Sequence, residues 1–187
     1  MTNKDALRIQ LRRLRQQLSD SQQIQASGDL AQQVIESGIL DNCDSLAVYL
    51  ANDGEIDPSA IVEVARQRKI PVYLPVLDES NSGHLKFHQW HISTKFARNK
   101  YGIPEPLGTQ EINAGLLHTV FIPLVGFDDQ GGRLGMGGGF YDRTFEQYND
   151  TSIRLIGLAH ECQKVASLQL EPWDIPMSKI ITNKSRY

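Results

Sequence analysis

The sequence predicts an α/β protein whose mainly parallel sheet carries helices on both faces, built as a single domain over residues 1–187. Apolar runs rich in β-favouring residues alternate with helical stretches along the chain. Most of these runs are continuously apolar, as in parallel strands that are buried on both faces. The 187 residues suffice for one domain with a full core, and no internal repeat or linker-like segment divides them.

Two helices are expected at the N-terminus. Residues 4–18 have an apolar stripe at helical spacing, formed by Leu7, Leu11, Leu14 and Leu18. Basic residues follow the same steps beside it, namely Lys4, Arg8, Arg12 and Arg15. The second helix, residues 22–37, ends before Gly38, a residue type that commonly terminates helices.

The rest of the chain is predicted to alternate strands with helices. The predicted strands are residues 45–50, 70–77, 120–127, 153–159 and 179–182, with a half-exposed strand around Leu85, Phe87 and Trp90. Asp57 and Pro58 form a helix start before residues 59–69, and a further helix covers about 140–148. Residues 101–106, with two prolines, are predicted to be a stiff connector.

Composition limits the classes of function. Hydrophobic residues make up 40% of the chain and charged residues 22%, which excludes a disordered or fibrous protein. The net charge of −3 argues against a nucleic-acid partner, and no run reaches the ~18 apolar residues of a membrane span. Cys43 and Cys162 form no CxxC motif and suit a reducing compartment. We therefore expect a cytoplasmic, monomeric protein that binds neither nucleic acid nor membrane.

The strongest functional motif is the glycine-rich segment 133–143, RLGMGGGFYDR. Four glycines in five positions let the backbone approach a ligand closely, and the segment leads from a strand into a helix, where amide groups and the helix dipole attract an anion. Arg133 is able to grip phosphate oxygens, and Asp142 is placed to hold a magnesium ion. We predict a phosphate-binding loop. A flexible connector, with Asp142 only favouring the helix dipole, is the alternative.

Four weaker candidate binding features lie elsewhere in the chain. Lys4 and Arg8 lie one helical turn apart and suit one polyphosphate, or else belong to a solvated helix face. Glu55 follows the carboxyl end of the first predicted strand, where α/β sheets bind ligands, so it suits an amino-heterocycle or is a turn acid. Tyr101 precedes the GIPEP turn and either stacks on a flat ligand or belongs to the core. Asp174, in EPWDIP, is either a second metal contact or an ordinary turn aspartate.

Two other groups of residues carry less weight. His84, His88 and His91 have a spacing that would suit zinc on a helix, but the expected extended chain turns His91 away from the other two. Cys162 has His160 nearby and no orienting acid. We predict neither a zinc site nor a thiol nucleophile.

The segment 133–143 resembles the signature of the 5-formyltetrahydrofolate cyclo-ligase family. The likeness extends to the basic N-terminal helix, the Glu55 turn, GIPEP at 102–106, VFIPLVGFDDQGGRLG at 120–135 and EPWDIP at 171–176. The resemblance implies an enzyme that uses ATP and magnesium to convert 5-formyltetrahydrofolate into 5,10-methenyltetrahydrofolate, releasing ADP and phosphate. In the family, ATP phosphorylates the formyl oxygen before the ring closes. The implied fold is similar to that of ribose-5-phosphate isomerase and CoA-transferase domains.

The resemblance also assigns roles to residues of this chain. Catalytic roles fall on Arg133 and Tyr141, and magnesium binding on Asp142 and Asp174. The ATP contacts would be Lys4, Arg8, Arg133, Gly135, Met136, Gly137, Gly138, Gly139, Phe140 and Tyr141. The folate contacts would be Leu50, Glu55, Tyr101, Met136, Gly137, Gly138, Gly139 and Phe140. The chain departs from the family in two ways, because many members have tyrosine at the position of Phe140 and some have basic residues at those of Met136 and Gly138.

Three other functions remain open from the sequence. A non-catalytic nucleotide-binding regulatory module would keep the glycine loop without needing Glu55 or Asp174. A sugar-phosphate isomerase-like enzyme on a similar sheet would need a general base and ignore ATP. A nucleic-acid-binding protein would use the basic first helix, against the overall acidity. One observation distinguishes the regulatory module from the cyclo-ligase. A cyclo-ligase consumes ATP only when the folate is present.

Overall fold

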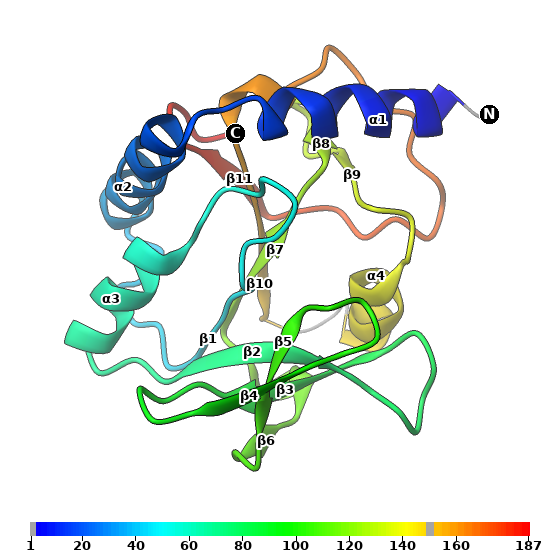
Figure 1. Cartoon of the computed structure of the whole chain (residues 1–187). Coiled ribbons are helices and arrows are strands. Elements are labelled where there is room, and N and C mark those ends of the chain that lie inside the picture. The colour runs from blue at the N-terminus through cyan, green and yellow to red at the C-terminus, as the bar shows by residue number, and fades with distance from the viewer. Residues whose placement is uncertain (1–2, 149–151) are drawn as a thin grey trace.

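The computed structural model of the chain describes residues 3–148 and 152–187 (Figure 1). Its helices are α1 (Asn3–Gln16), α2 (Asp20–Glu36), α3 (Ser59–Gln67) and α4 (Phe140–Phe145), with 3-10 turns η1 (Ala114–Leu116), η2 (Glu146–Tyr148) and η3 (Glu161–Gln163). Its strands are β1 (Leu46–Ala47), β2 (Val72–Leu77), β3 (Leu85–Gln89), β4 (Lys95–Arg98), β5 (Pro104–Leu107), β6 (Glu111–Ile112), β7 (Thr119–Pro123), β8 (Gly126–Phe127), β9 (Arg133–Leu134), β10 (Arg154–Ala159) and β11 (Lys179–Thr182).

A seven-stranded sheet in the order β11-β10-β7-β1-β2-β3-β6 forms the centre of the described chain. The first five strands in that order pair in parallel, and β3 and β6 extend the sheet with antiparallel pairing. Two further pairs, β4-β5 and β8-β9, are antiparallel. The predicted mixed α/β fold with a mostly parallel sheet is therefore confirmed.

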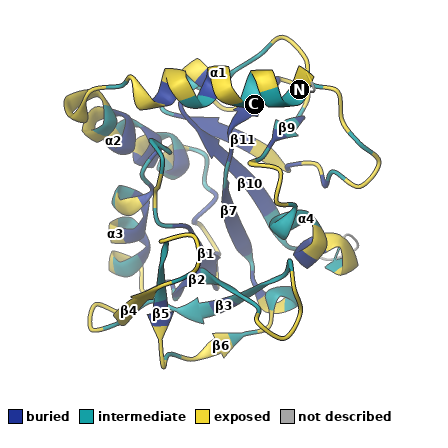
Figure 2. Ribbon diagram, turned by 45° about the vertical axis from the view of Figure 1, so that its right-hand side comes forward, coloured by how far each residue is buried: buried dark blue, intermediate teal, exposed yellow. Residues whose placement is uncertain are grey.

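The side chains of the parallel strands alternate between two cores. On one face, α2 and α3 cover Val48, Phe121 and Ile156. On the other face, α4 places Phe145 against Phe87, with ring centroids 5.8 Å apart. Figure 2 shows β7 and β10 buried between these layers. Helices therefore lie on both faces, as predicted.

Helix α1 does not join either layer. It lies across the ends of β7 and β10, at the top of the sheet in Figure 1. Leu11 packs there on Val125 and Leu134, which adjoin and belong to the β8-β9 pair. Because these are the carboxyl ends of parallel strands, α1 covers the edge of the sheet where α/β proteins bind ligands. No described helix is long and apolar enough to cross a lipid bilayer.

Three predicted elements differ from the structure. The strand expected over 120–127 is two strands, because the chain turns away from β10 after the Leu124 amide bonds the Leu158 carbonyl at 3.2 Å, and then pairs with β9. The first strand is only Leu46–Ala47, although the Val48 amide still bonds the Tyr73 carbonyl at 2.9 Å. The end of the connector expected over 101–106 belongs to β5, since prolines fit a short strand outside the main sheet.

Candidate functional site

Helix α1 places two basic side chains against segments far along the chain. Arg8 donates from Nε to the Gly135 carbonyl oxygen at 2.9 Å. Lys4 Nζ lies 3.1 Å from the Glu171 carboxylate and 3.8 Å from that of Asp174. Residues four apart on a helix share a face, so one face of α1 reaches both the glycine loop and the turn at 171–174. That Lys4 and Arg8 bind one polyphosphate stays a prediction, since here they bond Glu171 and Gly135 respectively.

Arg133 ties the glycine loop to the same turn. Its guanidinium donates to Oδ1 of Asp142 and to the carbonyl oxygen of Ile175. The Ile175 amide donates to that same Asp142 oxygen at 3.1 Å. Asp142 in α4 and Asp174, the residue before Ile175, are thereby brought to one place. Arg133 is nearly buried, so its charge is held in position rather than free in solvent.

The glycine loop between β9 and α4 presents backbone amides. Gly137 and Gly139 have φ values of 92° and 63°, left-handed conformations that favour glycine. Among the described residues, no hydrogen bond uses the amide hydrogens of 136–139. The helix that follows is shorter than predicted, with six residues before a 3-10 turn, so its dipole is weaker than that of the helix expected over 140–148. Anion attraction here depends mainly on local amides and basic side chains.

Glu55 lies in the turn that follows β1, with only 14% of its side chain exposed. Its Oε2 accepts a hydrogen bond from the Asn52 amide at 3.1 Å, and Arg15 Nη2 lies 3.7 Å from Oε1. Burial raises the pKa of Glu55 to about 7, against the opposing effect of the Arg15 charge. A carboxyl with this pKa is half-charged near neutral pH, which suits reversible recognition of a donor-rich ligand.

Tyr141 lies within the electrostatic reach of Glu55. Burial, and then the negative charge of Glu55, raise the pKa of the Tyr141 phenol well above its ordinary value, while Arg133 opposes the rise. The phenol is therefore neutral at physiological pH, and its hydroxyl keeps a proton that it can donate in a hydrogen bond.

Aromatic and apolar side chains border the loop on the side of the β4-β5 hairpin. Tyr101 is exposed and stands edge-on to Phe140, with ring centroids 6.2 Å apart. The guanidinium of Arg143 lies over the Phe140 ring, with its Cζ atom 5.7 Å from the ring centroid. Leu50 is half-buried and packs on the core under α2 and α3. Tyr101 and Phe140 therefore contact each other, and their stacking on a flat ligand stays a prediction, whereas Leu50 packs on the opposite core layer.

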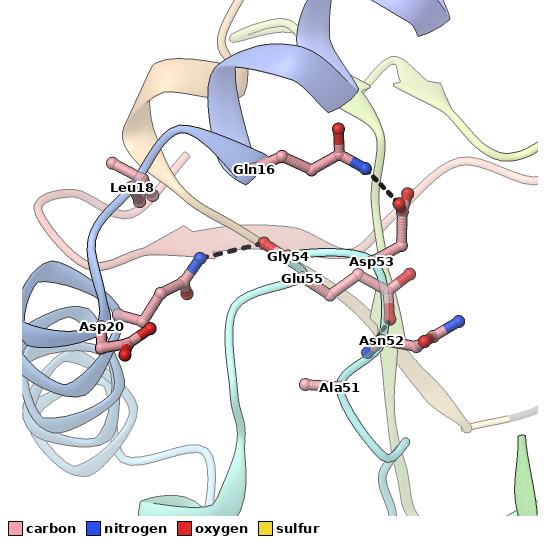
Figure 3. Close-up of a pocket in the computed structure, with 9 residues that line it drawn as sticks. Gln16, Leu18, Asp20, Ala51, Asn52, Asp53, Gly54 and Glu55 are labelled. Carbon is pink, nitrogen blue, oxygen red and sulfur yellow. Dashed lines mark hydrogen bonds between the residues drawn. The ribbon is translucent and has the colours of Figure 1, made fainter.

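The predicted site residues are divided between two cavities. One, of about 480 Å³, is lined by the end of α1, the start of α2 and residues 51–55, including Glu55 (Figure 3). The other, of about 520 Å³, lies beside the β4-β5 hairpin and includes Phe140 and Lys100. Of the residues described, Arg133 lines neither cavity. The Glu55 side and the Phe140 side are thus separate hollows in this structure.

The carboxylates fit a magnesium ion that is shared with phosphate oxygens. Oδ2 of Asp142 and Oδ1 of Asp174 accept no hydrogen bond from any described residue. The described residues contain no cluster of three or more metal-binding side chains. Magnesium usually takes one or two protein carboxylates and completes its shell with water and substrate phosphates, so two free carboxylate oxygens suit it.

Sequence reasoning missed the role of Arg15 and Asp53. Arg15 was grouped with the basic residues beside the leucine stripe, yet its side chain is fully buried and bonds Asp53. The available signal was its position four residues after Leu11, which places it on the buried stripe. Asp53 occupies an Asn-Asp-Gly turn and has a positive φ of 54°. The turn is visible in the sequence, but the sequence does not show that Arg15 bonds its aspartate.

Comparison with known proteins agrees over nearly the whole chain. The model of the 5-formyltetrahydrofolate cyclo-ligase family matches residues 1–183. A 5-formyltetrahydrofolate cyclo-ligase from Haemophilus influenzae is 37% identical over 94% of this chain and 95% of that protein. One from Escherichia coli K12 is 35% identical over 92% of this chain and 96% of that protein.

Solved structures share the fold. A 5,10-methenyltetrahydrofolate synthetase from Aquifex aeolicus superposes with a TM-score of 0.84 at 23% identity, covering 99% of this chain and 92% of that one. One from Mycoplasma pneumoniae gives a TM-score of 0.79 at 23% identity, with 98% and 100% covered. Sequence identity, family match and site geometry therefore point the same way, and the chain is an enzyme that belongs to the 5-formyltetrahydrofolate cyclo-ligase family.

Proposed function

We propose that the protein converts 5-formyltetrahydrofolate and ATP into 5,10-methenyltetrahydrofolate, ADP and phosphate; the names of its relatives support the cyclo-ligase activity. The observation that carries this proposal is the meeting of three segments at one place. Arg8 bonds the glycine loop at Gly135, and Arg133 bonds both Asp142 and the Ile175 carbonyl. A loop of free amides ringed by cations and two carboxylates is the equipment that phosphoryl transfer needs.

The triphosphate end of ATP is assigned to the loop and its cations. Lys4, Arg8 and Arg133 offset the phosphate charge, and the amides of 136–139 donate to phosphate oxygens. Arg133 must divide its donors between Asp142 and the transferred phosphoryl group. Asp142 and Asp174 would hold magnesium, which supplies charge neutralisation between the phosphates when it is bound.

The folate end is assigned to the turn after β1 and to the aromatic pair. Glu55, as a carboxylate, accepts paired hydrogen bonds from the amino group and ring N–H of the pterin. Tyr101 and Phe140 offer apolar ring faces to the flat substrate, and Leu50 is assigned to the edge of its pocket. Because Glu55 and Phe140 line different hollows, a substrate that contacts both residues would bridge the Glu55 side and the Phe140 side.

The chemistry follows from the poor leaving ability of an amide-like oxygen. The formyl oxygen attacks the γ-phosphorus, and the bond to ADP breaks. N10 of the folate then attacks the activated formyl carbon, the carbon–oxygen bond breaks, phosphate leaves, and the N10 proton passes to solvent. Arg133 stabilises the charge on the transferred phosphoryl oxygens. The Tyr141 hydroxyl, which burial keeps protonated, would donate to the same oxygens. No protein nucleophile is needed, since positioning and charge neutralisation supply the catalysis.

An absorbance time course tests this function. The purified protein is mixed with 5-formyltetrahydrofolate, with and without magnesium-ATP, while the near-ultraviolet band of the methenyl product and the release of ADP are followed. We expect product and ADP to rise together, and only when both substrates are present. ATP binding without product would reduce the protein to a nucleotide-binding module and refute the proposed reaction.

A further inference from the structure

Arg15 is a cation with no exposed side-chain surface, at the end of α1. Its Nε donates to the Asp53 carbonyl oxygen at 2.8 Å, Nη2 to the Asp53 carboxylate at 2.8 Å, and Nη1 to the Leu124 carbonyl oxygen at 3.1 Å. A buried guanidinium is costly unless its donors are satisfied, and these three bonds satisfy most of them. One side chain thus joins α1, the 52–55 turn and the end of β7.

The turn that Arg15 holds has a backbone which needs external support. Asp53 and Gly54 both have positive φ values, 54° and 74°. A Cβ on Gly54 would lie 3.2 Å from the carbonyl oxygen of Arg15, so the turn is pressed against the last turn of α1. The side-chain amide of Gln23 donates hydrogen bonds from Nε2 to the Arg15 carbonyl oxygen at 3.2 Å and to the Gly54 carbonyl oxygen at 3.4 Å. The left-handed conformation of a non-glycine residue persists only when its surroundings hold it.

Glu55 is the last residue of this turn. Its Oε1 lies 3.7 Å from Nη2 of Arg15, the nitrogen that also bonds Asp53. Arg12 bonds the same Asp53 carboxylate at 2.7 Å but from a partly exposed position, and no ion pair joins it to Glu55 in the described chain. Arg15 is therefore the cation that reaches both acids, and Arg12 reaches one.

We propose that Arg15 is a positioning residue for the reduced folate, which holds the turn at Asp53, favours the charged form of the Glu55 carboxyl and aims it at the substrate ring. The proposal rests on the function proposed above, because it assumes that Glu55 meets the folate. It adds that recognition depends on a residue that touches no substrate. Arg15 acts by fixing geometry through Asp53 and by offsetting the cost of a buried anion at Glu55.

The charge state of Glu55 also depends on its other neighbours. The groups that act on Glu55, or on which it acts, are Arg15 and Arg12 of α1, Asp53 of the turn, Tyr49 after β1 and Tyr141 of α4. Of these, Arg15 gives the largest electrostatic lowering of the Glu55 pKa. Loss of its charge is therefore expected to move the pH dependence of folate binding to higher pH, which a purely structural role would not do.

The test compares four variants of the whole chain. Arg15→Met removes the charge, Arg15→Lys keeps the charge without the forked donors, and Gly54→Ala displaces the turn without changing any charge. Arg12→Met is the matched control, since it removes a cation from the same Asp53 carboxylate. The dissociation constant of 5-formyltetrahydrofolate is measured by calorimetry from pH 6 to pH 8, with the KM for ATP and the melting temperature alongside.

We expect Arg15→Lys, Arg15→Met and Gly54→Ala to weaken folate binding by about ten- to a hundredfold, with the KM for ATP unchanged. Arg15→Met should also move the pH dependence upward, and Arg12→Met should bind folate like the unaltered protein. If Arg15→Met does not fold, the folate binding of Arg15→Lys and Gly54→Ala tests the proposal. Folded variants with unchanged folate binding, or with equal losses for folate and ATP, overturn the proposal.

The same data separate the two proposals. If the unaltered protein binds folate but makes no methenyl product, the proposed reaction fails and the binding constants still judge Arg15. If it binds no folate at all, both proposals fail. Selective loss of folate binding in a protein that also forms product supports both.

Discussion

The Arg133 guanidinium is paired with the Asp142 carboxylate, and the Ile175 amide donates to the same carboxylate oxygen. The cation proposed for phosphate and the acid proposed for magnesium are thus bound to one another in this structure. If the proposed function holds, binding of magnesium-ATP would loosen that pair, because each partner would gain a further ligand of opposite charge. The site is therefore assembled before substrate arrives, with its two key charges compensating one another.

Replacement of Arg133 by lysine should slow the reaction strongly. Lysine keeps the charge but not the planar fork that bonds Asp142 and Ile175 together. We expect kcat to fall by about 10²- to 10³-fold, as when a preorganised electrostatic donor is lost. Steady-state measurement of methenyl product at saturating ATP and folate checks this. A folded Arg133→Lys protein with normal kcat would exclude Arg133 from catalysis.

Asp142→Asn should change the response to magnesium. The amide keeps the side-chain shape and still accepts from the Ile175 amide, but it binds magnesium weakly. We expect the magnesium concentration for half-maximal activity to rise about tenfold or more. Titration of activity with magnesium at fixed ATP measures it, and circular dichroism controls for folding. An unmoved titration curve would show that Asp142 is not a ligand.

Arg8→Gln should weaken ATP binding in particular. Arg8 bonds the glycine loop at Gly135 and lies beside Gly137, on the phosphate side of the proposed site. We expect the KM for ATP to rise about tenfold, with little change in the KM for folate. Arg13→Gln is the control, because Arg13 is an exposed residue of the same helix. Equal effects of the two substitutions would mean that only the net charge of α1 matters.

Stability should depend on Glu55 between about pH 4.5 and pH 7. Burial raises its pKa from 4.5 to about 7 in the folded protein, so over this range the folded state holds a proton that the unfolded state has lost. Stability from this group is present below pH 4.5 and is lost as pH rises through 7. Glu55→Gln has no such slope, so its free energy of unfolding should exceed that of the unaltered protein by a few kcal/mol at pH 8, and much less at pH 4.5. Urea unfolding at both pH values measures the difference, and a pH-independent gap would contradict it.

Much of the fold and of the glycine loop was predictable from local pattern. Leucine spacing predicted α1, and near-continuous apolar runs predicted the parallel strands. Arg133, the four glycines and Asp142 lie together in the chain, so their spatial association follows from ten residues of sequence. The break at Pro123, the β5 strand and the early end of α4 were not foreseen, because partner strands and local packing decide them.

By itself, the sequence determined the α/β class, the family and the residue types of the glycine loop, because these depend on periodicity and on neighbours within a short segment. Only the tertiary structure decided which distant groups pair. It placed Arg8 on Gly135 across 127 residues and Arg15 on Asp53 across 38. It also buried Glu55, which raises the Glu55 pKa. The physical reason is that burial and electrostatic pairing depend on the surroundings in three dimensions, and one sequence alone does not specify the surroundings of a side chain.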